Sequence, residues 1–119
     1  MQAINLKDKF NQFIDQWTPK VITTLDDNHV YLTKIKGEFV WHAHDGQDEM
    51  FVVIEGRFKM EFRDREVWVE QGEIIVVPAG VEHRPAAEEE CKIMVIENAG
   101  TDHSGGAETE LRQEEHERI

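Results

Sequence analysis

The sequence predicts an all-β domain, either a sandwich or a barrel, preceded by one short helix. From Val21 onward, short segments rich in β-branched and aromatic residues alternate with turn residues such as Asp45-Gly46 and Gln71-Gly72. Short strands at this spacing are typical of sandwiches and barrels. The chain has 119 residues, of which 39% are hydrophobic and 32% charged, so its composition suits one globular domain.

The N-terminal segment predicts an amphipathic helix over residues 5–17. Asn5 is a suitable N-cap, and Pro19 ends the helical pattern. The apolar residues recur at intervals of three and four, which is the period of one helix face: Phe10, Phe13, Ile14 and Trp17. We therefore assign residues 1–19 to the helical part of the chain.

The strands of the following part, residues 20–99, are of two kinds. Residues 57–62 (RFKMEF) alternate between apolar and charged side chains, as expected for a strand with one face toward the core. By contrast, residues 50–56 and 73–78 are apolar on both faces, so each needs a cover on its outer side. The helix can cover one of them and a second copy of the chain the other. We therefore expect a homodimer that buries the outer residues Met50, Val52 and Ile54.

The charge and the C-terminal composition exclude several classes of protein. Asp and Glu number 25 against 13 Lys and Arg, and a net charge of -12 disfavours a nucleic-acid partner. No apolar stretch is long enough for a membrane span or a signal segment, so we expect a cytoplasmic protein without a membrane partner. Residues 100–119 are polar and acidic and predict a poorly ordered tail. Cys91 is the single cysteine, which excludes an intrachain disulfide and a cysteine-based zinc cluster.

Two stretches place metal-binding residue types beside predicted strands. His42 and His44 are two residues apart, so in a strand their side chains share a face. After a turn, Glu49 starts a returning strand from which it can meet both histidines, whereas Asp48 has the opposite parity. About 40 residues later a second strand ends in a tight turn and delivers His83. Three imidazoles and one carboxylate suit Mn(II), Fe(II), Ni(II), Zn(II) or Cu(II).

Both stretches resemble the two motifs of the cupins. The first cupin motif is similar to Gly37, His42, His44, Glu49 and Gly56, with four residues between His44 and Glu49 and six between Glu49 and Gly56. The second is similar to Gly72, Pro78, Gly80 and His83. Two departures, the four-residue interval from Gly37 to His42 and Ala87 in place of a frequent asparagine, do not involve a ligand position.

The resemblance implies a small antiparallel barrel of the jelly-roll (double-stranded β-helix) type, often dimeric. One divalent transition metal would lie inside one end, bound by His42, His44, Glu49 and His83. Cupins include dioxygenases, isomerases, decarboxylases and lyases as well as sensor domains and storage proteins, so the fold leaves the reaction open. We expect either a metal-dependent enzyme acting on a small, polar, metal-chelating metabolite or a non-catalytic module that binds such a molecule.

The sequence does not identify the catalytic residues. A general acid or base could come from Tyr31, Glu38 or Glu97, because strand parity allows each of them to face the barrel interior without requiring it. For each of the three, a structural or solvent-facing role is the simpler interpretation. His29, His103 and His116 are interpreted as surface histidines.

Overall fold

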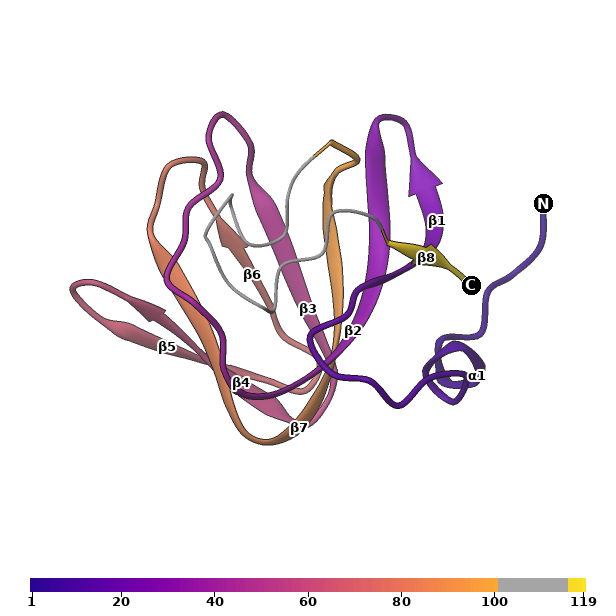
Figure 1. The fold of residues 1–119 in the computed structure, drawn as a ribbon, viewed down its shortest axis with the longest axis horizontal. Coiled ribbons are helices and arrows are strands. Elements are labelled where there is room, and N and C mark those ends of the chain that lie inside the picture. The colour runs from indigo at the N-terminus through magenta and orange to yellow at the C-terminus, as the bar shows by residue number, and fades with distance from the viewer. Residues whose placement is uncertain (101–115) are drawn as a thin grey trace.

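The structure is a computed structural model that describes residues 1–100 and 116–119 of the chain. One short helix and eight strands follow each other along the chain (Figure 1). They are α1 (Leu6–Phe10), β1 (Lys20–Leu25), β2 (Asn28–Glu38), β3 (Glu49–Glu55), β4 (Arg57–Phe62), β5 (Glu66–Glu70), β6 (Ile74–Val77), β7 (His83–Asn98) and β8 (Glu117–Arg118). No helix in these residues is long and apolar enough to cross a membrane.

The strand β7 organises the sheet, because it pairs with three other strands along its length. Its C-terminal half lies antiparallel to both β2 and β3, and its N-terminal half lies antiparallel to β4. The strand order is β5-β4-β7-β2-β1-β8, with β3 joining β6 to β7. Figure 1 shows these strands curving around a common interior. The predicted jelly-roll β-fold is confirmed, although the sheet is not closed into a complete ring of hydrogen bonds.

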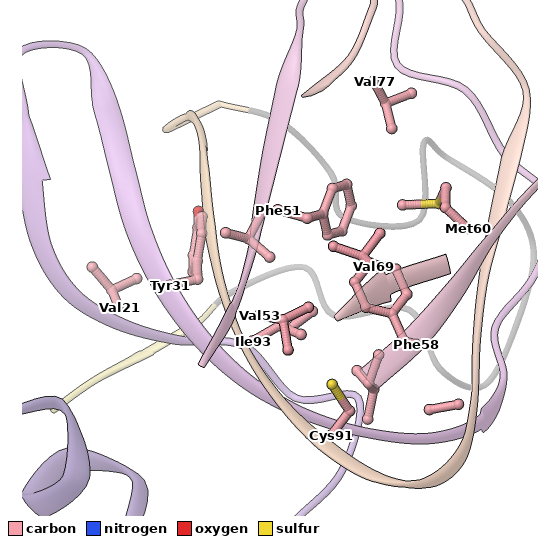
Figure 2. Packing of buried hydrophobic residues seen from close by; sticks show 13 residues of the cluster. Val21, Tyr31, Phe51, Val53, Phe58, Met60, Val69, Val77, Cys91 and Ile93 are labelled. Carbon is pink, nitrogen blue, oxygen red and sulfur yellow. The ribbon is translucent and has the colours of Figure 1, made fainter. Parts of the chain in front are cut away.

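Alternation along the strands fills the interior with apolar side chains. On β3, the buried residues Glu49, Phe51 and Val53 alternate with half-buried ones, and on β4 Phe58 and Met60 are fully buried. Figure 2 shows Phe51, Val53, Phe58 and Ile93 pointing into one cluster between the strands. Gly56 allows the β3–β4 turn to approach β7 closely: a Cβ there would lie 3.3 Å from the Glu90 carbonyl oxygen, and its φ of +91° disfavours other residues.

The helix is shorter than the sequence predicts. α1 is only five residues long, with the predicted N-cap at Asn5, whose side chain accepts a hydrogen bond from the Asp8 backbone N–H at 3.0 Å. The remainder of the predicted helix lies along β2 instead, and Ile14 is 89% exposed. Phe10 and Phe13 still bury together, against Leu32 of β2. So short a helix is marginal by itself, and hydrogen bonds to a strand edge compete with its extension.

The last four residues also differ from the expected tail. Residues 101–115 lie outside the described part of the chain, but β8 pairs in parallel with β1. The Glu117 carboxylate lies 3.0 Å from the buried Lys20 ammonium, and Ile119 packs against the cluster formed by Phe10, Phe13 and Leu32. Residues 116–119 are therefore part of the folded domain. Composition did not reveal this, because the contacts involve residues almost a hundred positions away.

Candidate metal centre

The structure brings His42, His44, Glu49 and His83 together. Glu49 is the first residue of β3 and His83 the first of β7, so both lie where a loop enters a strand. His42 and His83 face each other across a two-residue bridge, in which each backbone N–H donates to the other residue's carbonyl, at 3.1 and 2.9 Å. Each of the four residues offers one ligand atom, and these atoms all lie within 4.8 Å of one another.

Four buried side chains make up the cluster, and several of their polar atoms have no satisfying hydrogen bond. His83 is completely buried, and the other three are between 4% and 7% exposed. In the described residues, His44 Nε2, Glu49 Oε1 and His83 Nε2 make no well-formed hydrogen bond, although Glu49 Oε1 lies 3.1 and 3.4 Å from the two nitrogens. Buried polar atoms in such an arrangement are costly unless they bind something else.

Two of the imidazoles are oriented for metal binding by the backbone. His42 Nδ1 donates to the Val40 carbonyl and His83 Nδ1 to the Val81 carbonyl, both at 2.9 Å. Because a carbonyl only accepts, each neutral ring carries its proton on Nδ1 and keeps the Nε2 lone pair free. A hydrogen bond of this kind from the second ring nitrogen is the usual support of a metal-binding histidine.

The electrostatics of the cluster favour the protonation states that a metal requires. Burial, reinforced by the neighbouring His83, lowers the pKa of His42 to about 4, so that this imidazole is neutral near pH 7. Burial opposes the ionisation of Glu49, but its interactions with the neighbouring Glu97, His44 and His83 outweigh it and hold the pKa of Glu49 below its ordinary value. Neutral imidazole and ionised carboxylate are the forms that bind a divalent transition metal. The four residues therefore fit such an ion and could hold one.

A cavity that is partly open to solvent reaches the cluster at His42 and Glu49. Its walls come from the N-terminal segment, from β2, β3 and β7, and from the β2–β3 loop. Most of the lining is apolar: Trp17, Pro19, Ile35, Phe39, Phe51, Pro85, Ile93 and Val95. The remaining lining residues, Tyr31, Thr33 and Glu97, are polar. A mostly apolar lining with a few polar groups is typical of small-molecule sites.

The structure distinguishes the three candidate acid–base residues. Tyr31 and Glu97 line the cavity, whereas the Glu38 side chain is 63% exposed and pairs with Arg84 at 3.3 Å. Burial, then the charge of Glu97, raises the pKa of Tyr31 to about 12, so its hydroxyl stays protonated near pH 7. Glu97 is 3% exposed and lies beside the candidate ligand Glu49. Glu38 therefore faces away from the site.

Two of the histidines interpreted as surface residues contact Tyr31. His29 Nδ1 lies 3.0 Å from the Tyr31 hydroxyl, and the His116 ring centroid lies 5.0 Å from that of Tyr31. The third, His103, lies outside the described residues. Asp48, ranked below Glu49 from parity, accepts a hydrogen bond from the Ala79 N–H at 2.9 Å and thereby joins the two loops that carry the histidines.

Sequence reasoning missed the aromatic wall of the cavity. The apolar periodicity predicts Trp17 on the apolar face of a helix, but in the structure it lies beside β2 and stacks on Phe39, with ring centroids 4.9 Å apart. A proline two residues later was the available signal, since the residue before a proline is disfavoured in a helix. Nothing local indicated that Phe39 and Trp17 would meet.

Comparison with known families identifies the fold. The sequence pattern described as "Cupin domain" matches residues 29–97, which include all four residues of the cluster. The chain belongs to the cupin family. Among curated proteins, this cupin is 36% identical over 64 residues to the Bacillus subtilis (strain 168) protein YdbB, and 36% identical over 59 residues to a Vitis vinifera protein named acireductone dioxygenase 1. The matches cover 53% and 45% of this chain but only 57% and 31% of the two relatives.

Solved structures show the same relationship over more of the chain. A cupin-2 domain protein from Shewanella frigidimarina is 49% identical, with a TM-score of 0.80, and the match covers 81% of this cupin and 94% of that chain. The Neisseria meningitidis protein NMB1881 is 31% identical with a TM-score of 0.75, over 82% of this cupin and all of that chain. The resemblance that the two histidine-containing stretches suggested is confirmed.

Proposed function

We propose that this cupin is a metal-dependent enzyme in which His42, His44, Glu49 and His83 bind one divalent transition metal. Its substrate is a small molecule that chelates the ion. The observation that carries the proposal is the contact between the buried cluster and the cavity: a structural metal site is closed by protein ligands, whereas this one meets open space at His42 and Glu49. Mn(II), Fe(II), Ni(II), Zn(II) and Cu(II) all suit three imidazoles and one carboxylate.

The protein's own residues contribute orientation and exclusion of water. The carbonyls of Val40 and Val81 fix the rings of His42 and His83, and the apolar cavity wall offers water few hydrogen-bond partners beside the site. The protonated Tyr31 hydroxyl can donate a hydrogen bond to a bound substrate. When bound, the ion supplies Lewis-acid chemistry or, if redox-active, chemistry with dioxygen.

A second candidate is a non-catalytic module that uses a metal to hold a small molecule. The polar groups in the cavity favour it: the Tyr31 hydroxyl stays protonated, and Glu97 is in contact with Glu49. The similarity to a protein named acireductone dioxygenase favours the enzyme, although it covers only 31% of that relative. An oxygenase, an isomerase and a lyase all remain within the proposal.

Metal analysis of protein purified without a histidine tag or chelator tests the site. We expect about one transition-metal ion per chain, and a small bidentate anion such as oxalate should change its spectrum without removing it. Oxygen uptake with a panel of chelating metabolites then separates the two candidates. An ion that no added ligand perturbs would contradict the open site and the enzyme with it.

We also propose that the chain forms a homodimer through the outer face of β3 and β6. Ile74 and Val76 are 58% and 45% exposed, and they lie opposite the half-buried Val52 and Met50 on the neighbouring strand. The Phe10–Phe13 cluster covers only the Ile54 end of this face. Light scattering should give a dimer at micromolar concentration, and Val76→Lys should give a monomer. The cytoplasmic location and the absence of nucleic-acid partners stay predictions from the sequence.

A further inference from the structure

We infer that Trp17 and Phe39 are specificity-determining residues, and that they select a chelating molecule with a flat apolar body over a hydroxylated one. This inference rests on the proposed function, because it concerns the rest of the molecule whose oxygen atoms reach the metal. It narrows the small, metal-chelating metabolites that the cupin resemblance allows to those that carry an apolar body.

A continuous path of aromatic rings leads from the cavity wall to the candidate metal centre. The Trp17 and Phe39 rings are stacked, with centroids 4.9 Å apart and planes inclined by 19°. Phe39 in turn meets His42 edge to face, at a centroid distance of 5.3 Å and an angle of 87°. Trp17, Phe39 and His42 all line the cavity. A molecule bound at the His42 side of the metal centre therefore has its body against this aromatic wall.

The backbone holds Trp17 in an uncommon conformation that places its ring at the cavity. Its φ is +57°, in the left-handed region that residues other than glycine seldom adopt. Its N–H donates to the Lys34 carbonyl and its indole Nε1–H to the Lys36 carbonyl, both at 2.9 Å. Because the indole N–H is already used by the backbone, Trp17 offers the cavity only its apolar ring. Strained conformations that the surroundings maintain are often found at functional sites.

The distribution of polar and apolar groups in the cavity also favours a ligand with a flat apolar body. The apolar wall includes Pro19, Ile35 and Phe51 in addition to the two aromatic rings, while polar groups come only from the β2 and β7 residues Tyr31, Thr33 and Glu97 and from the metal cluster. Hydroxyl groups placed against the apolar wall would lose their hydrogen bonds to water without replacement. A flat apolar body would instead gain from its removal from water.

A matched pair of 2-oxo acids tests the inference in the full-length protein loaded with Ni(II). Glyoxylate and phenylglyoxylate have the same chelating head and differ by a phenyl ring. The ratio of their dissociation constants, measured by calorimetry, therefore reports how much the aromatic wall contributes to binding. We expect phenylglyoxylate to bind at least about tenfold more tightly. In Trp17→Gly, which suits the positive φ, the ratio should fall to about threefold or less, because phenylglyoxylate loses more affinity than glyoxylate.

Matched control variants distinguish the loss of the aromatic wall from a general disturbance of the fold. Trp68→Ala removes a tryptophan that is 39% exposed, lies over Arg57 and is not part of the cavity, so it should keep the full ratio. If Trp17→Gly does not fold or retain nickel, Phe39→Leu trims the other ring and should lower the ratio in the same way. Equal affinities in the wild type, or an equal loss for both acids in the variants, would overturn the inference alone. If neither acid perturbs the bound nickel, the proposed open site is wrong, and the inference with it.

Discussion

Two buried regions of the same barrel differ in what their burial does for the protein. The apolar floor, defined as Val53, Phe58, Cys91 and Ile93, consists of side chains whose removal from water stabilises the fold (Figure 2). The four residues of the candidate metal centre are buried to a similar degree, yet they are polar groups whose burial costs free energy unless they gain a hydrogen bond or a metal ion. Strand β3 contributes to both regions, with Glu49 at its start and Val53 four positions later. The fold can therefore be stable because of the apolar floor, while the polar cluster remains available to hold a metal ion.

The largest expected effect is on the apolar floor. Phe58 is fully buried, so Phe58→Ala should lower the free energy of unfolding by about 3–5 kcal/mol, through lost burial and the cavity left behind. Chemical denaturation measures this change. The metal content per folded chain should stay at the wild-type value, and a parallel loss of metal affinity in the folded protein would show that the two regions are not separable.

The pH dependence of the metal-free protein should come from the polar region. The pKa of His42 is lowered to about 4, so the folded state resists a proton that the unfolded chain accepts below about pH 6.5. Stability is therefore complete above pH 6.5 and falls as the pH drops toward 4, by about 3 kcal/mol from this residue. Denaturation midpoints with chelator at pH 7 and 4.5 measure the loss. The same pH slope in His42→Gln would contradict the assignment.

Removal of one candidate ligand should affect the metal far more than the fold. Glu49→Gln keeps the shape of the side chain but removes its charge, and we expect metal affinity to fall at least about a hundredfold. In chelator-treated protein the variant should remain folded, because the apolar floor is intact. Glu88→Gln, at an exposed position of β7, is the matched control and should change neither quantity. Unchanged metal affinity in Glu49→Gln would exclude Glu49 as a ligand.

The smallest expected effect concerns the C-terminal strand, which touches neither of the two regions. Deleting residues 116–119 removes the β8 pairing, the Glu117 contact with Lys20 and the partial burial of Ile119. We expect a loss of about 1–3 kcal/mol, mostly from apolar burial and from leaving Lys20 with one fewer partner. Thermal unfolding measures it, and Arg118→Lys serves as a conservative control. An unchanged transition in the deletion would show that β8 adds nothing to the folded state.

Local sequence rules predicted the candidate ligands, although His42 and His44 lie in the β2–β3 loop and not in a strand as expected. The two-residue period of a strand predicted a shared face for His42 and His44, and the structure brings both into the cluster from a loop in which His42 makes one bridge to His83. The turn residues around Pro78 precede His83, which begins β7. The same alternation predicted the burial of Phe58 and Met60. These features depend on residues a few positions apart, so they can be recognised without the tertiary structure.

The surroundings of the site were decided only by contacts between distant segments. Trp17 does not continue the predicted helix, because its backbone N–H and its indole N–H donate hydrogen bonds to carbonyls at the edge of β2. His116 reached Tyr31 because β8 returned to pair with β1. Which of Tyr31, Glu38 and Glu97 faces the cavity likewise depended on how β2 and β7 curve. Hence the sequence by itself determined which atoms could bind a metal, while tertiary packing decided what those atoms face, because a cavity wall is assembled from segments that no local pattern connects.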